Sequence, residues 1–346
     1  MTFSGNPRKV LHLRNSRLLG SAMLSVAAIV FVSEPNAAMA APPITALAVS
    51  MDGRELVAGS QAGISVYSLP DLKVIRSPET ELEAIHDIRF SPDGRRIAVA
   101  GGTPAQFGLV EIMEWPSAKV ITRIREHDDV VYSVAWHSDG HWLATASLDG
   151  VCGVVAADTS QLAHRIEGHS KGLTGVAWIS AVIADPANPG AEDSLLVTSS
   201  LDQTLRVWSM KIGQPEKPPK LVKTLDQHTG AVIGLALQPV SPSDAVPLLA
   251  SIGDDRTVRI WQPVTGRLMR FAKLAESPTA VAWTSDGASI VVGTRSGQCV
   301  IVDPSTAAFH IAATVTEPII SLAADRMTDR IFAGDQSGTV ASAATR

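Results

Sequence analysis

One short pattern recurs along this chain of 346 residues and limits its fold more than any other feature. The tripeptide Val-Ala-Trp occurs three times, ending at Trp136, Trp178 and Trp283. An Asp-Gly turn follows a strand of this kind four times, at Gly53, Gly94, Gly140 and Gly287. Because Asp-Gly between alternating apolar runs is a strong hairpin signal, the pattern predicts a tandem array of antiparallel units.

The second half of the unit repeats as well. Leu196–Asp202 leads to Thr204–Trp208, and Leu249–Asp255 leads to Thr257–Trp261, with Asp six residues before Trp in both. Laid end to end, seven units begin near residues 44, 84, 128, 170, 229, 278 and 318. About 44 residues per unit is the period of a four-stranded propeller blade. We therefore predict an all-β, seven-bladed β-propeller of four-stranded antiparallel blades over residues 41–346.

Residues 1–40 have the three parts of a secretory signal. Four cations precede an apolar run, Leu18–Val32, and Ala38-Met39-Ala40 supplies small residues for a cut after Ala40. The alternative is an uncleaved membrane anchor, but the run is shorter than the roughly 20 residues that span a bilayer. We expect a periplasmic or secreted protein with no membrane span after cleavage.

Composition narrows the classes of function. The net charge is −5, and without residues 1–40 it is −8, so a general nucleic-acid binder is not expected. The only asparagine after residue 40, Asn188, precedes Pro189 and forms no glycosylation sequon, which fits a bacterial periplasmic protein. Cys152 and Cys299 hold the same position in units three and six, so we expect two buried free thiols.

These residues resemble the WD-repeat family of β-propellers, as a bacterial, secreted member. Gly168-His169 with Asp202 and Trp208 fits the family unit best, and units one, six and seven are degenerate. The resemblance implies hydrogen-bonded side-chain sets that tie outer strands to inner ones. These sets are His169–Thr198–Asp202–Trp208, His228–Ser251–Asp255–Trp261 and the partial set His127–Thr145–Asp149, which ends on Val155.

A catalytic interpretation of the same residues exists, because His with Asp and Ser resembles a nucleophile set. The pattern repeats around the ring, whereas an enzyme needs one site, so we favour a structural role. His137 and His141 flank Asp139 and could hold a metal, but a third firm ligand is not evident. We expect no metal and no cofactor.

By family analogy, the loops between units share one face with the turns between second and third strands. The charged residues placed there are Glu126, Asp128, Asp129, Lys171, Arg256, Glu276 and Glu317. This acidic face suits a basic protein partner, and the alternative is a solvated rim that keeps the protein soluble. We expect a non-catalytic platform for protein–protein interaction. The rival hypotheses are a periplasmic propeller enzyme and an accessory subunit of an electron-transfer system.

The last unit lacks a fourth strand. Ala41-Pro42-Pro43 is too short to supply one, so the sequence predicts a three-stranded last blade with an exposed edge. The protein is then expected to be a monomer unless that edge is paired.

Overall fold

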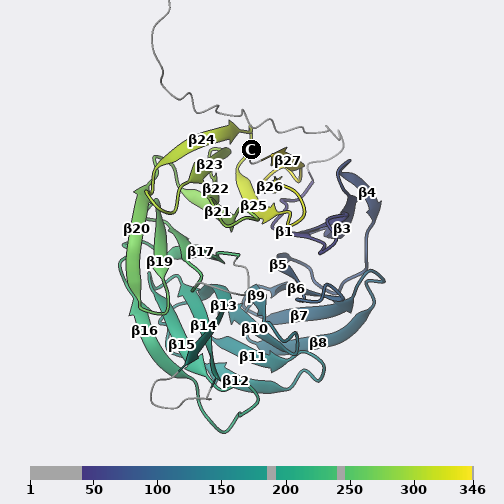
Figure 1. The fold of residues 1–346 in the computed structure, drawn as a ribbon. Coiled ribbons are helices and arrows are strands. Elements are labelled where there is room, and N and C mark those ends of the chain that lie inside the picture. The colour runs from purple at the N-terminus through teal and green to yellow at the C-terminus, as the bar shows by residue number, and fades with distance from the viewer. Residues whose placement is uncertain (1–40, 185–191, 240–245, 345–346) are drawn as a thin grey trace, which may run out of the picture.

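The computed structural model describes residues 41–184, 192–239 and 246–344, which form seven antiparallel sheets arranged in a ring (Figure 1). The proposed signal segment lies outside the described residues. Blades 1 and 2 comprise β1 (Ala46–Val49), β2 (Glu55–Ser60), β3 (Gly63–Ser68), β4 (Lys73–Arg76), β5 (Ile85–Phe90), β6 (Arg96–Thr103), β7 (Phe107–Glu114) and β8 (Val120–His127). Blades 3 and 4 comprise β9 (Val131–Trp136), β10 (Trp142–Ser147), β11 (Cys152–Ala156), β12 (Leu162–Ile166), β13 (Leu173–Ala184), β14 (Glu192–Ser200), β15 (Leu205–Met210) and β16 (Lys220–Leu225).

Blades 5 to 7 complete the ring. They comprise β17 (Val232–Leu237), β18 (Leu249–Gly253), β19 (Thr257–Gln262), β20 (Arg267–Lys273), β21 (Pro278–Trp283), β22 (Ile290–Thr294), β23 (Gln298–Val302), β24 (Phe309–Thr314), β25 (Ile319–Ala324), β26 (Arg330–Asp335) and β27 (Val340–Ala344). Six blades have four strands, and the last has the three strands β25–β26–β27. The predicted propeller with a three-stranded last blade is confirmed.

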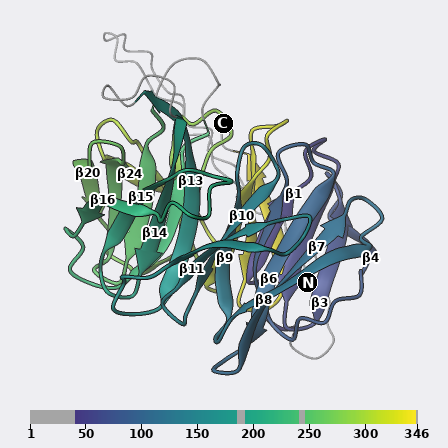
Figure 2. The same cartoon turned by 90° about the horizontal axis from the view of Figure 1, so that it is seen from below.

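Each blade buries both of its faces against its neighbours, which stand beside it in the ring (Figure 2). Successive side chains of a strand point to opposite faces, so one strand serves two cores. In β2, Val57 packs in the cluster shared with blade 2, whereas Leu56 and Ala58 pack in the cluster shared with blade 7. Apolar clusters occupy all seven blade interfaces, which accounts for a hydrophobic sequence without a single large core.

Blade 7 closes the ring on blade 1 by packing face to face. Phe332 and Val340 share a cluster with Leu56. The Ile44 amide donates to the Asp335 carbonyl (3.1 Å), and the Ser321 hydroxyl donates to the Ile44 carbonyl (2.7 Å). The first and last described segments are therefore fixed to each other.

Across the described ranges, no helix has the length and hydropathy needed to cross a membrane.

Candidate functional site

Blade 5 contains a complete chain of hydrogen bonds from Trp261 to Asp255. The Trp261 indole N–H donates to the Ser251 hydroxyl (2.8 Å), and that hydroxyl lies 2.8 Å from His228 Nε2. Because the Asp255 carboxylate can only accept, the proton of neutral His228 lies on Nδ1, and Nε2 accepts the Ser251 hydroxyl proton. Nδ1 lies 3.0 Å from Asp255 Oδ2, so His228 donates there and every polar group has a partner.

Blades 3 and 4 carry the related sets. In blade 4, His169 lies 2.9 Å from Asp202 and 2.8 Å from Thr198, which accepts from the Trp208 indole at 3.0 Å. In blade 3, His127 lies 2.9 Å from Asp149 and 2.7 Å from Thr145. No indole reaches Thr145, and the Gly153 amide donates to its hydroxyl instead, at 3.2 Å. All residues assigned to the three sets are brought together.

Burial and hydrogen bonding shift the pKa values of groups in the blade 4 and blade 5 sets. Burial lowers the pKa of His228 to about 4, against the opposing charge of Asp255. Burial also opposes ionisation of Asp255 and Asp202, but hydrogen bonds from Thr257 and Thr204, among others, outweigh it and lower each pKa to about 2. At neutral pH the blade 5 set therefore pairs a neutral imidazole with a carboxylate inside the blade, which suits a structural role.

Blade 2 holds a different buried group, which the sequence analysis missed. Glu111 on β7 is completely buried. Its carboxylate accepts from the Thr80 hydroxyl at 2.5 Å and from Arg123 Nε at 3.0 Å. Thr80 belongs to the connection between blades 1 and 2, so this carboxylate fastens that connection to blade 2. The one signal in the sequence is a glutamate inside the apolar run Leu109–Met113.

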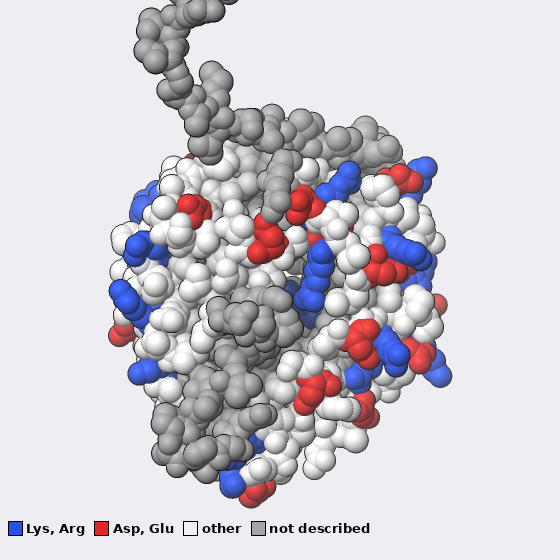
Figure 3. All heavy atoms as spheres, in the orientation of Figure 1, with Lys and Arg blue, Asp and Glu red and all other residues white. Residues whose placement is uncertain are grey.

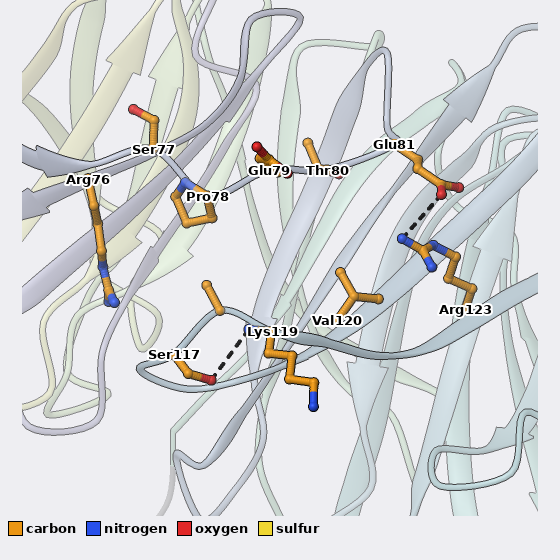
Figure 4. A pocket seen from close by; sticks show the side chains of 11 residues that line it. Arg76, Ser77, Pro78, Glu79, Thr80, Glu81, Ser117, Lys119, Val120 and Arg123 are labelled. Carbon is orange, nitrogen blue, oxygen red and sulfur yellow. Dashed lines mark hydrogen bonds and ion pairs between the residues drawn. The ribbon is translucent and has the colours of Figure 1, made fainter.

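A cavity of about 580 Å³ lies between this connection and β8 (Figure 4). Arg76 and Arg123 stand at its two sides in the figure. Arg76 is paired with Glu55 at 2.9 Å and stacks over Trp115, and Arg123 is paired with Glu81 at 3.2 Å. These internal pairs compensate the charge of both guanidinium groups. None of the seven predicted face residues lines the cavity.

A repeated backbone hydrogen bond joins the loops of one face, here called the loop rim. In blade 4, the Leu201 amide of the turn between second and third strands donates to the Gly172 carbonyl of the loop that enters the blade (3.0 Å). The same bond recurs in blades 3, 5, 6 and 7, through Leu148–Val130, Asp254–Ala231, Arg295–Ser277 and Gln336–Pro318. Inter-unit loops and second-to-third-strand turns therefore share one face, as the family analogy implied.

The predicted face residues lie in these loops and turns, or next to them. The exposed ones are Glu126, Asp128, Lys171, Arg256 and Glu276, and the half-buried ones are Asp129 and Glu317. The side chains of two of the seven also form hydrogen bonds with the backbone of neighbouring segments. Asp129 accepts from the Ala105 amide (2.9 Å), and Arg256 donates to the Ala275 carbonyl (3.3 Å).

The structure adds two exposed rim residues, Asp254 and Arg295. Sequence analysis missed Asp254 because its neighbour Asp255 matched the family position. On the side shown in Figure 3, Lys and Arg predominate along the left edge, both signs mix on the right, and wide areas carry no charge.

The two histidines considered as metal ligands contact different partners. His137 lies near Asp139 (3.0 Å) and Ser194 (3.2 Å), while His141 faces Asp158 (3.6 Å). Among the described residues no group of three His, Cys, Asp or Glu is placed to hold a metal ion. Cys152 and Cys299 are buried free thiols in blades 3 and 6, and burial raises the pKa of Cys299 to about 12.

Comparison with known proteins supports the family. Residues 118–154, 160–209 and 219–262 match the family model "WD domain, G-beta repeat". These segments, which make up less than half of the chain, hold the best-preserved side-chain sets.

Three curated proteins illustrate the level of sequence identity. The chain is 24% identical over 216 residues to cell division cycle 20.1, cofactor of APC complex, of Arabidopsis thaliana, covering 60% of this chain and 42% of that protein. It is 24% identical over 296 residues to the periodic tryptophan protein 2 homolog of Mus musculus (73% and 30%). It is 28% identical over 163 residues to the chromatin assembly factor 1 subunit FAS2 homolog of rice, Oryza sativa (46% and 30%). The chain spans less than half the length of each.

Proposed function

We propose that this protein is a non-catalytic platform that binds another protein, and that it acts in the bacterial periplasm or outside the cell after cleavage behind Ala40. The loop rim is the binding surface, and its partner carries basic residues. The single observation that carries the proposal is how the polar residues are divided. The His and Asp side chains of the three sets are buried inside the blades, while charged side chains of the loops are exposed at one face.

Two further points support it. A rigid scaffold that presents loops is a common arrangement for binding sites. By their names, two of the relatives are a cofactor of a complex and a subunit of an assembly factor, which fits a WD-repeat chain that acts through other proteins.

Charge reversal on the rim tests the binding surface. Glu126 and Asp128 are exposed, whereas His127 between them is buried. Changing both to Lys leaves the Asp128 amide free to keep its bond to Asp149. We expect the double variant to recover about tenfold less partner than the wild type when used as bait in the native envelope fraction.

The matched control changes two exposed acidic residues in connections between third and fourth strands, Asp71 and Glu216, to Lys. It alters the net charge equally and is expected to bind as the wild type does. Equal loss in both variants, or no stoichiometric partner for the wild type, contradicts the proposal.

The cellular setting has its own test. Terminal sequencing of the protein from the envelope fraction is expected to begin at Ala41. A chain that keeps residues 1–40 contradicts the proposed processing.

A further inference from the structure

The third strand of blade 7 differs from the third strands of the other blades in its pairing. Among the described residues, β27 is hydrogen-bonded to β26 alone, whereas the six other third strands each have a fourth strand on their outer side (Figure 1). The side chains of Val340, Ala341 and Ala343 are buried by neighbouring blades. The part of β27 available to a partner is therefore its outer backbone edge, because these side chains already pack within the propeller.

The direction of the free backbone groups follows from the ladder. The Asp335 amide donates to the Thr339 carbonyl at 3.0 Å, and the pairing continues with Gly334 opposite Val340. Because hydrogen-bonded and non-hydrogen-bonded pairs alternate in an antiparallel sheet, Val340 and Ser342 direct their N–H and C=O groups away from β26. An added antiparallel strand would find these groups at the spacing it needs.

The edge also lacks the usual protection against pairing. Charged side chains, Pro and bulges protect free edges in natural sheets. Five of the six outer strands, β4, β8, β12, β16 and β20, carry Lys or Arg, but β27 reads Val-Ala-Ser-Ala-Ala. Its pairing with β26 shows no bulge. These features indicate an edge that is normally covered.

The outer strands of blades 3 and 4 indicate which kind of strand fits the edge of β27. Cys152, Leu205 and Val340 are each the first paired residue after the turn into a third strand. Opposite Cys152 the outer strand places Ile166, and opposite Leu205 it places Leu225, which are only 5% and 1% exposed. A strand docked on β27 would therefore bury an aliphatic side chain opposite Val340.

We infer that the edge of β27 receives an antiparallel strand from a protein partner, with an aliphatic residue opposite Val340. The inference rests on the cleavage proposed above, because a chain that starts at Ala41 has no residue ahead of it to cover this edge. Ala41 itself lies against Gly338, in the turn that precedes β27. The edge of β27 is separate from the loop rim, so the proposal for either surface can be wrong while the other is right.

A peptide with the sequence of residues 218–227 tests the inference, since it contains β16 and Leu225. We expect it to bind purified protein of residues 41–346 saturably in fluorescence anisotropy. Replacing its Leu225 by Asp is expected to weaken binding at least about tenfold, because an aliphatic contact becomes a buried charge. In the protein, Ser342→Pro is expected to abolish binding, because it removes an outward N–H, and Ser342→Ala is expected to retain it.

Hydrogen exchange supplies a second measurement on the same samples. The Ser342 amide is expected to exchange faster than the Leu205 amide in the free protein and to become protected when the peptide is added. No saturable binding up to about 1 mM peptide, or equal binding by Ser342→Pro, overturns the inference. Protection of the Ser342 amide without peptide also overturns the inference. If this protection increases with protein concentration, a second copy of the chain covers the edge. If it does not, the chain itself covers the edge.

The test uses no native partner, so a missing rim partner does not affect it. A failure of cleavage is detected separately by terminal sequencing.

Discussion

The burial of its hydrogen-bond partners separates His228 from a catalytic histidine. His228 has a donor partner at Nε2 and an acceptor at Nδ1, and both partners are buried. A catalytic triad has the same connectivity, but its serine must be reached by substrate, whereas Ser251 is completely buried and accepts the Trp261 indole N–H. These bonds fit a role of the side-chain set in stabilising its blade.

Removing the hydroxyl of Ser251 tests the stabilising role. Ser251→Ala leaves the Trp261 N–H and His228 Nε2 without partners in a buried site, so we expect a loss of about 2 to 4 kcal/mol in the free energy of unfolding. Urea denaturation measures it. Ser251→Thr is the control, because Thr198 fills the same role in blade 4, and it should remain within about 1 kcal/mol of the wild type. Equal stability of the Ala and Thr variants would show that the hydroxyl contributes little.

Stability is expected to fall in acid in two steps. The pKa of His228 is lowered from 6.5 to about 4, so the unfolded chain takes up a proton first as the pH falls. This contribution is complete above pH 6.5 and is lost toward pH 4, with a size on the order of 3 kcal/mol. Asp202 and Asp255, with pKa values lowered from 3.8 to about 2, add a further loss between those values. Urea midpoints that stay constant from pH 7 to pH 4 would contradict this assignment.

His, Asp and Trp recur at fixed spacing in several units, which supports the resemblance to the WD-repeat family, and that resemblance implied the side-chain sets. Glu111 could not be, because one glutamate within an apolar run has no repeated partner. Its partners Thr80 and Arg123 lie 31 and 12 residues away along the chain, and only the packing of blade 2 brings them to it.

At the scale of strands, the blades are tied together by bonds that local pattern does not reveal. The sequence predicts Val-Ala-Trp as a recurring strand, and the structure gives its indole a further role. Trp136, Trp178 and Trp283 each donate to a backbone carbonyl in the preceding blade, at 3.0, 3.1 and 3.0 Å. Sequence analysis finds the strand because its period is local, and misses the bond because its acceptor lies 43 to 47 residues earlier.

The connection between blades 1 and 2 depends on Glu111. In Glu111→Ala, Thr80 loses its acceptor and the connection is expected to open, with a loss of about 1 to 3 kcal/mol. Limited proteolysis should then cut within residues 77–84 faster than in the wild type. Glu111→Gln keeps an acceptor oxygen and should resist cleavage more than the Ala variant. Glu114→Ala, an exposed change at the end of the same strand, is the control. Unchanged cleavage in Glu111→Ala would contradict the role of this carboxylate.

At the scale of the molecule, the number of blades follows from the period of the sequence, but the closure does not. The contact of Ser321 with Ile44 joins residues 277 positions apart, and no repeat predicts it. The loop rim was placed by family analogy, and the repeated backbone bond between loop and turn gives that placement a physical basis.

Amine cross-linking in the native envelope fraction tests whether a partner binds the loop rim. Lys171 is exposed on the rim, whereas Lys220 and Lys223 are exposed on the outer strand of the same blade. Mass spectrometry is expected to find partner cross-links at Lys171 and none at the two outer lysines. Cross-links confined to Lys220 and Lys223, with Lys171 unlinked, would contradict the account.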